Sequence, residues 1–185
     1  MLSKTKTIEA VQTMGDLFPD AHCELNHRNA FELLIATILS AQATGVGVNK
    51  VTPKLFERFP TPAHLAAASE ESVIECIQSL GLYRSKAKNI RLCAQQLMER
   101  FNGEVPCTRE ELVSLAGVGR KTANVVMSVA FNIPAFAVDT HVERISKRLQ
   151  ICRQKDSVLE VEETLCRKIP KELWSRAHHW MIFFG

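Results

Sequence analysis

The sequence has no long hydrophobic run and no targeting segment. No apolar stretch approaches the roughly 18 residues that a membrane-spanning helix needs. The N-terminal residues lack the apolar core of a signal peptide and the acid-poor, arginine-rich composition of a transit peptide. We therefore expect a cytoplasmic or nucleoid-associated protein that has no membrane partner.

The sequence also lacks cysteine pairs at redox or metal-ligand spacing. None of the six cysteines forms a C-x-x-C motif. Cys76, Cys93 and Cys166 lie among the apolar positions of helical segments. We expect the cysteines to be buried or half-buried reduced thiols, and we assign no metal ligand.

Strand patterns, internal repeats and low-complexity tracts are absent as well. No segment alternates apolar and polar residues for long enough to predict a strand, whereas nearly every segment has helical periodicity. Hydrophobic residues make up 46% of the chain and charged residues 23%, which is sufficient for a packed core. The sequence predicts an all-α protein of about ten short helices. The net charge of +3 is compatible with a nucleic-acid partner, but many proteins that bind none have such a charge.

Apolar stripes and capping residues locate the helices. Residues 31–43 are almost wholly apolar and predict a central core helix. N-cap residues predict helix starts at Thr61 and Ser69. Two capping boxes are predicted, Thr108 with Glu111 and Ser157 with Glu160, and the first helix has an apolar stripe of Ile8, Val11, Met14 and Leu17.

The most informative segment is Gly117-Val118-Gly119, which separates a helix starting at Thr108 from one starting at about Arg120. The two glycines permit a tight turn with positive φ angles, and Val118 can fill the core between the helices. Backbone N–H groups at the start of the second helix form a phosphate site, to which Arg120 and Lys121 add positive charge. Such a site gives sequence-independent, salt-sensitive binding. The alternative is an ordinary helix–turn–helix corner, but the apolar neighbours and the basic pair favour the phosphate site.

An acidic N-cap residue, Asp139, follows Lys121 after 18 residues, within the segment 137–141. An aspartate at this position is most often structural, and an exposed lysine most often serves solubility. The occurrence of both after a phosphate-binding hairpin favours a catalytic pair.

With these features the chain resembles the endonuclease III family, within the helix-hairpin-helix superfamily of DNA base-excision glycosylases. The resemblance runs from about Leu25 to Gly185. Lys121 separates the chain from adenine-removing relatives, which lack a lysine there and cannot nick the strand by the same route. The motifs that carry the resemblance are 31–36, 39–44, 81–87, 102–106, 115–124, 138–141 and 178–180.

The resemblance implies a two-lobed, all-α fold. One lobe, residues 22–132, is a central six-helix bundle that contains the helix-hairpin-helix motif at about 108–131. The second lobe is built from residues 1–21 together with 133–185. Nothing in the sequence suggests an obligate oligomer, so we expect a monomer.

The resemblance also implies a bifunctional DNA glycosylase and abasic-site (AP) lyase of base excision repair. Such an enzyme removes oxidised pyrimidines from damaged double-stranded DNA and nicks the strand 3′ to the abasic site by β-elimination. Lys121 matches the nucleophile that forms the Schiff base, and Asp139 matches its acidic partner. The DNA-contacting residues are predicted to be Gln42, Leu82, Gly117, Val118, Gly119, Arg120 and His141.

Physical chemistry supports these roles. An enzyme that acts on a base must extrude it from the stack. Gln42 can hydrogen-bond the orphaned partner base, and Leu82, held at a turn by Gly81, can wedge the stack open. Without the family match, both residues would be interpreted as ordinary helix-end or loop residues. Lys121 must be neutral to attack, and the helix dipole and Arg120 both disfavour its protonated form, whereas Asp139 is expected to stay ionised.

The chain departs from the family in two places. Most members continue past the segment 178–180 into a loop whose four cysteines bind a [4Fe–4S] cluster, but this sequence stops at Gly185 and its cysteines lack that spacing. We therefore expect no cofactor on the chain as given, which would be either truncated or a cluster-free form. Gly45 stands where many relatives have an acidic residue. The alternative functions are a non-catalytic DNA-binding module, as a truncated and inactive form, and the same chemistry on an oxidised purine.

Overall fold

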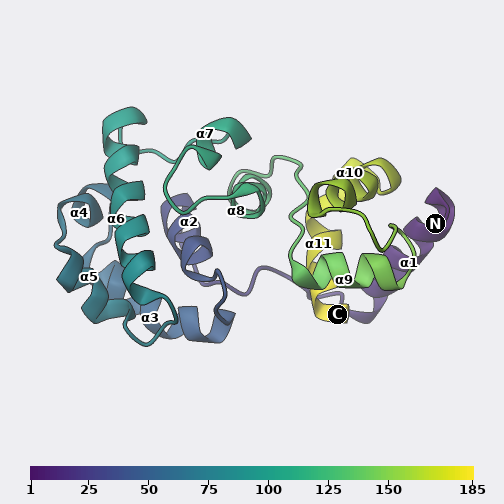
Figure 1. Ribbon diagram of the computed structural model, residues 1–185, viewed down its shortest axis with the longest axis horizontal. Helices are drawn as coiled ribbons and strands as arrows, with labels where there is room; N and C mark the ends of the chain where they lie inside the picture. The colour runs from purple at the N-terminus through teal and green to yellow at the C-terminus, as the bar shows by residue number, and fades with distance from the viewer. The chain divides into compact units, whose positions relative to one another are not determined.

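The computed structural model describes residues 1–185, and all of its regular structure is helical (Figure 1). This confirms the predicted all-α class. The chain divides into two compact units, one of residues Glu24–Phe131 and one of Met1–Cys23 with Asn132–Gly185. No helix combines the length and the apolar character needed for a membrane crossing.

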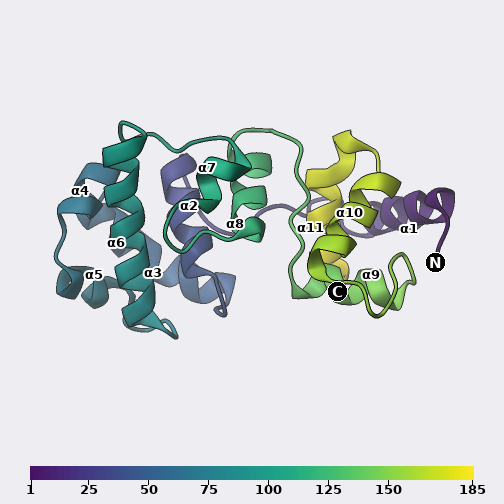
Figure 2. The ribbon, with the colours of Figure 1, turned by 45° about the horizontal axis from the view of Figure 1, so that its top comes forward.

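The Glu24–Phe131 unit is arranged around α2 (Ala30–Leu39), in which every residue from Phe31 to Leu39 is buried. Figures 1 and 2 both show α2 between the longest helix, α6, and the short helix α8. The remaining elements of this unit are α3 (Gly45–Arg58), α4 (Pro62–Ala67), α5 (Glu70–Ile77), α6 (Tyr83–Arg100), α7 (Arg109–Val113), α8 (Arg120–Val125) and a π-helical turn, η1 (Val126–Ala130).

The helix starts in this unit follow the expected capping chemistry. The side chains of Thr61 and Ser69 accept hydrogen bonds from the first turns of α4 and α5, as the sequence predicts. Thr108 also caps its helix, but it does not form the predicted capping box with Glu111. The Glu111 carboxylate accepts a hydrogen bond from the Thr108 hydroxyl, at 2.7 Å, rather than from its backbone N–H.

The core helix α2 is shorter than its apolar run. The sequence predicts a helix over 31–43, but α2 ends at Leu39. Ser40 closes it, because its N–H and its hydroxyl both donate to carbonyls of the last turn. Gln42 then adopts a left-handed backbone, and Thr44 caps the next helix. Residues 40–44 are therefore a connection between two helices, which exposes Gln42.

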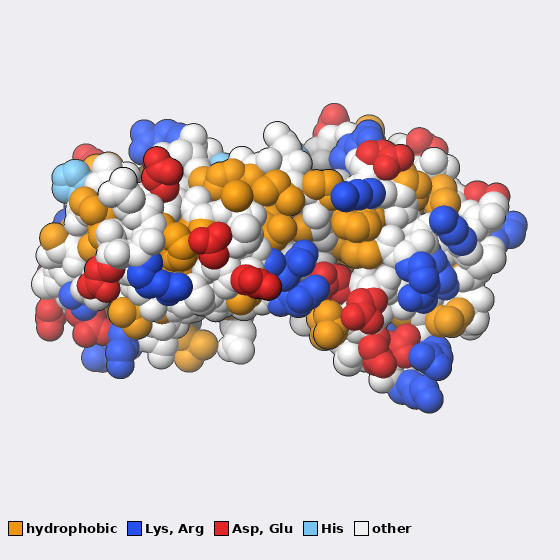
Figure 3. All heavy atoms as spheres, turned by 90° about the horizontal axis from the view of Figure 1, so that it is seen from above, with side chains coloured by type: hydrophobic (Ala, Val, Ile, Leu, Met, Phe, Trp, Pro, Cys, Tyr) orange, Lys and Arg blue, Asp and Glu red, His pale blue; other side chains and the backbone are white.

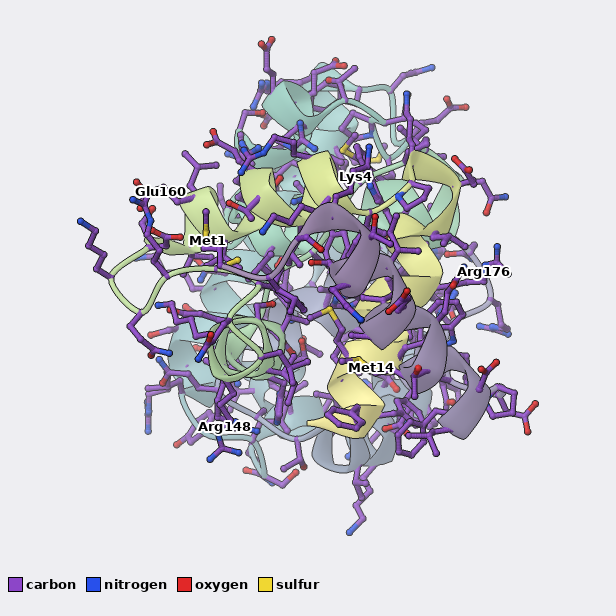
Figure 4. All side chains as sticks on the ribbon, turned by 90° about the vertical axis from the view of Figure 1, so that its right-hand side faces the viewer. Met1, Lys4, Met14, Arg148, Glu160 and Arg176 are labelled. Carbon is purple, nitrogen blue, oxygen red and sulfur yellow. The ribbon has the colours of Figure 1, made fainter.

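The second unit consists of α1 (Lys4–Leu17), α9 (Thr140–Arg148), α10 (Val158–Lys168), the 3-10 turn η2 (Lys171–Leu173) and α11 (Trp174–Phe184). Figure 4 shows α1 beside α11, with Met14 labelled on α1. Its core brings together side chains from both ends of the chain, among them Val11, Met14, Phe136, Val142, Val161, Leu165 and Met181.

Close packing of α1 on α11 explains which face of α1 is buried. A Cβ added at Gly15 would lie 2.8 Å from the Trp180 ring, so only glycine lets these helices approach so closely. Leu17 lies off this contact and is 60% exposed, so its predicted place in the apolar stripe is wrong. The predicted capping box of Ser157 and Glu160 at the start of α10 is confirmed.

Candidate active site

The hairpin between α7 and α8 depends on one of its two glycines for its backbone. Gly117 has a φ of 76°, and a Cβ there would lie 3.0 Å from Ile38 Cγ2 and 3.1 Å from Asn89 Cβ. Gly119 instead has an extended backbone, with φ −96° and ψ −175°, and a Cβ there would meet no atom within 4 Å. The expectation of positive φ angles at both glycines is therefore wrong for Gly119. Gly119 is therefore distinguished by the open space around its Cα and not by a strained backbone.

The hairpin turn is anchored to the core and leaves the start of α8 open. Val118 is 8% exposed and fills the core as predicted. The Ala116 N–H donates to Gln96 Oε1 on α6, at 2.8 Å. Gly119 is the N-cap residue of α8, and no side-chain hydrogen bond caps the N–H groups of the first turn. Both Gly119 and Arg120 are exposed. The first turn of α8 thus presents backbone N–H groups at the surface, which is the arrangement that binds phosphate.

Lys121 lies in this first turn of α8. It is half-buried, between the exposed Arg120 and the buried Thr122. Its side chain therefore starts at the boundary between the core of the unit and the open hairpin, beside the positive end of the helix dipole.

Asp139 is the N-cap residue of α9, as predicted. Its Oδ1 accepts a hydrogen bond of 2.8 Å from the Val142 N–H, and its Oδ2 lies 3.3 Å from His141 Nδ1. The side chain is 19% exposed. Burial by itself would raise the pKa of the carboxyl, but the Val142 N–H, His178 and His141 together outweigh it and hold this pKa below its usual value. The carboxylate is therefore ionised at neutral pH.

His178 is a neighbour of Asp139 that the sequence does not predict as a site residue. It is buried in α11, and its Nδ1 donates to the Ala137 carbonyl at 2.7 Å. This bond anchors the segment that leads into Asp139, and the charge of His178 contributes to the lowered pKa of the carboxyl. The only sequence signal was the His178-His179-Trp180 motif, whose partner lies 41 residues away in the chain.

Gln42 and Leu82 share an unusual backbone. Gln42 has a φ of 53° and Leu82 a φ of 57°, in the left-handed region that side chains other than glycine rarely adopt. Both are exposed, Leu82 by 59%. Gly81 lies in the turn before α6, as predicted, but the left-handed backbone of that turn belongs to Leu82. Backbone strain of this kind is common at ligand-contacting positions.

These two turns lie at one edge of the Glu24–Phe131 unit. Gln42 follows the end of α2, and Leu82 precedes the start of α6. Figures 1 and 2 place both helix ends toward the bottom of the unit. The unit therefore contains Gln42, Leu82, the hairpin and Lys121, whereas Asp139 and His141 belong to the other unit.

A surface pocket of about 350 Å³ in the Glu24–Phe131 unit is separate from these residues. It lies at the start of α2, against Asn29 and Phe31, while Gln42 follows the other end of that helix. Because a ten-residue helix is about 15 Å long, the pocket and the two strained turns are well apart. None of the predicted site residues lines the pocket.

The cysteines do not fit an iron–sulfur cluster. Such a cluster needs four thiolates around one site. No group of three or more His, Cys, Asp or Glu side chains is placed to share a metal ion. Cys107 is exposed, so the expectation that all six thiols are at least half-buried is wrong there.

Charge on the visible surface is mixed. Figure 3 shows Lys and Arg side chains interspersed with Asp and Glu over one face of the molecule. With a net charge of +3, attraction of a polyanion must rest on local features such as the hairpin rather than on a uniform field.

An all-helical fold with a glycine hairpin, an adjacent lysine and an N-cap aspartate is typical of a base-excision glycosylase. The family model described as HhH-GPD superfamily base excision DNA repair protein matches residues 35–171. Endonuclease III of Bacillus subtilis is 59% identical over 97% of this chain and 83% of its own length. Endonuclease III of Haemophilus influenzae is 46% identical over 100% of this chain and 87% of its own.

The chain therefore belongs to the endonuclease III family of the HhH-GPD superfamily. A solved structure, a trapped covalent intermediate of an endonuclease III with DNA, has a TM-score of 0.97 and 59% identity, covering 100% of this chain and 87% of that one. The match confirms the predicted helix-hairpin-helix glycosylase fold. The chain is a DNA glycosylase and AP lyase of base excision repair.

Proposed function

We propose that this chain removes oxidised pyrimidines from double-stranded DNA and then nicks the strand 3′ to the abasic site, with Lys121 as the nucleophile. The observation that carries the proposal is the position of Lys121, a half-buried lysine in the first turn of α8, directly after the hairpin. The 59%-identical relative trapped as a covalent intermediate with DNA supports a covalent route.

In the proposed reaction, the neutral amine of Lys121 attacks C1′ of the sugar, and the glycosidic bond breaks. The base leaves with the bonding electron pair and takes up a proton. Opening of the sugar ring gives a Schiff base between Lys121 and C1′. Loss of a proton from C2′ then expels the 3′ phosphate with the electrons of the C3′–O bond. One nucleophile thus serves both steps.

Asp139 is proposed to stabilise the positive charge that develops at C1′ as the base leaves. Its lowered pKa supports this role, because the carboxylate is ionised before DNA binds. Its hydrogen bond to the Val142 N–H fixes one oxygen, and the contact with His141 orients the other. His141 is also proposed to contact DNA, and nearly half of its side chain is exposed.

The proposed DNA contacts fall into two groups. At the hairpin, Gly117, Gly119 and Arg120 bind a phosphate, while Val118 holds the turn on the core. The open space at Gly119 supports this role, because a side chain there would obstruct a phosphate without touching the protein. At the strained turns, Gln42 pairs with the orphaned base and Leu82 fills the gap in the stack.

We also propose that the two compact units are the two lobes of the family fold and that the chain acts as a monomer at the nucleoid. The division at Glu24 and Phe131 supports the first statement. For the family's [4Fe–4S] cluster, we propose that residues 1–185 bind none, since no set of cysteines gathers at one site. Iron analysis of the purified protein tests this, and stoichiometric iron and sulfide would contradict it.

Borohydride trapping on a duplex with one abasic site tests the main proposal. Reduction converts a Schiff base into a permanent protein–DNA adduct. We expect an adduct with the parent chain and with Lys54→Ala, an exposed lysine of the same unit, but none with Lys121→Ala. A parent chain that is folded yet forms no adduct would contradict the proposal and favour the non-catalytic DNA-binding module. The lesion is tested separately, by base release from oxidised-pyrimidine and oxidised-purine duplexes.

A further inference from the structure

One amine in the Glu24–Phe131 unit is buried without a partner. Lys86 of α6 is 4% exposed, and its Nζ makes no hydrogen bond. Lysine is almost never fully buried unless its amine is paired, because removing a charge from water is costly. Packing of α6 does not depend on the Lys86 amine, because apolar residues such as Ala87 and Ile90 are buried beside it on the same helix.

The neighbours of Lys86 on α6 connect the strained turn to the hairpin. Lys86 lies one helical turn after Leu82, and its N–H donates to the Leu82 carbonyl at 3.0 Å. One turn further along the same face, Asn89 packs against the position of Gly117, together with Ile38 from the last turn of α2. The buried amine therefore lies on the face of α6 that spans the proposed DNA-contacting groups.

The turn that leads into this face of α6 is exposed and strained. Leu82 is mostly exposed, and both it and Gln42 have left-handed backbones. The segment before Leu82 approaches the first turn of α3, where Leu80 Cδ2 lies 3.6 Å from the Cβ position of Gly47. Figures 1 and 2 show these helix ends together at the same edge of the unit. Strained segments of low packing density are those that move most readily when a ligand binds.

The Lys86 amine is buried without a nearby carboxylate to balance a positive charge. Burial lowers the pKa of the Lys86 amine, and no neighbouring charge compensates. An anion brought close to it would reverse this effect and would gain a strong, charge-assisted hydrogen bond.

We propose that Lys86 is a further DNA-contacting residue, whose amine pairs with a backbone phosphate when the Gln42 and Leu82 turns open around a lesion. This inference rests on the proposed function, because it assumes that the edge formed by these turns binds damaged DNA. It adds a contact that forms only at a lesion, since the amine is covered in the free protein. The contact links recognition of the lesion to the movement of the two turns.

The test is the salt dependence of binding to a duplex with a tetrahydrofuran abasic analogue, which cannot form a Schiff base. The variants are Lys86→Met and, as control, Lys88→Met, an exposed lysine of the same helix. One lost phosphate contact lowers the slope of log affinity against log salt by about 0.9. Raising the salt from about 50 to 200 mM should therefore cost Lys86→Met roughly 3.5-fold less affinity than it costs the parent. Lys88→Met should behave as the parent does.

Two further measurements decide the interpretation. Lys86→Met should unfold at a higher urea concentration than the parent, because the variant buries no unpaired amine. An unchanged salt slope, an equal change on undamaged duplex, or a lower unfolding midpoint would each overturn the proposal. Borohydride trapping at low salt distinguishes a failure of the Lys86 proposal from a failure of the proposed function. An adduct with Lys86→Met shows that the proposed chemistry is intact, whereas no adduct even with the parent refutes the proposed function itself.

Discussion

At the scale of single residues, Asp139 combines a structural and a chemical property. Its carboxylate caps α9 through Val142, and the same contact helps to keep it ionised despite its burial. A residue that begins a helix is held by backbone geometry, so its charge is positioned without the mobility of a surface side chain. His178 strengthens this arrangement, because it binds the carbonyl two residues earlier.

Asp139→Asn should separate the two properties. Asparagine keeps the cap, but it removes the charge. Because the folded-state pKa lies below the unfolded value of about 3.9, the carboxylate stabilises the fold above that value, and this contribution is lost as the pH falls toward the folded-state pKa. Acid unfolding of the variant should therefore depend less steeply on pH below about 5. Base release should fall on the order of a hundredfold or more.

Asp156→Asn is the matched control, because Asp156 also has a lowered pKa, chiefly through the Arg153 N–H, and belongs to the same unit. Asp156→Asn should make the free energy of unfolding depend less steeply on pH in acid, without loss of base release. Equal loss of activity in both variants would show that Asp139 acts through stability alone.

Leu82→Gly tests whether strain is retained for function. Glycine relieves the strain of the positive φ, which offsets the cost of a more flexible unfolded chain, and few contacts are lost because Leu82 is exposed, so the variant should be at least as stable as the parent. Removal of the wedge should at the same time reduce excision. Urea unfolding and single-turnover base release measure the two effects. Asn102→Gly, at another exposed left-handed position, should leave excision unchanged, and a destabilised Leu82→Gly would contradict the account of strain.

At the scale of elements, α3 has an unusual first residue. Gly45 occupies the first position of the helix after the cap of Thr44, and the first turn contains no acidic residue. A Cβ at this position would lie 3.9 Å from Leu25 Cδ2, which is an ordinary contact. The space and the backbone both admit a side chain, in contrast to Gly15, whose Cβ would strike the Trp180 ring.

Gly45→Asp should stabilise the protein by about 1 kcal/mol. Part of the gain comes from a less flexible unfolded chain, and part from a negative charge at the positive end of the helix dipole. Urea unfolding at low and high salt measures it. Gly45→Asn should retain only the first part, so the difference between the two variants should shrink as salt rises. A destabilised Gly45→Asp would mean that the contact with Leu25 is tighter than its distance indicates.

At the scale of the whole molecule, the small net charge limits long-range attraction to DNA. The total is +3, and basic and acidic side chains alternate over the surface shown in Figure 3. Binding to undamaged DNA should therefore be weak, independent of sequence and dependent on a few local contacts.

Arg120→Ala should weaken binding to undamaged duplexes of any sequence and lower the salt slope by about 1. We expect this because Arg120 is the first residue of α8, where the proposed phosphate contact lies. Fluorescence anisotropy with two unrelated duplexes, each at several salt concentrations, measures the effect. Arg58→Ala is the control, because it removes the same charge from the last turn of a different helix, α3. An equal loss with both variants would indicate a diffuse charge effect instead of a hairpin contact.

The sequence by itself determined the features that depend on near neighbours in the chain. Helix starts at Thr61, Ser69 and Asp139 were predictable, because a capping side chain bonds to an N–H three residues later. The helical class and the hairpin around Val118 followed from periodicity and spacing for the same reason. The assignment of Lys121 and Asp139 as a pair rests on the family motifs and awaits its test.

Only the tertiary structure decided what depends on residues far apart in the sequence. Ile38 and Asn89 leave little room for a side chain at Gly117, whereas a Cβ at Gly119 would meet no atom within 4 Å. The partner of His178, the Ala137 carbonyl, likewise lies 41 residues away in the chain. The burial of Lys86 has the same origin, because a sequence pattern marks a lysine as charged but does not show whether the packed helices leave its amine a partner.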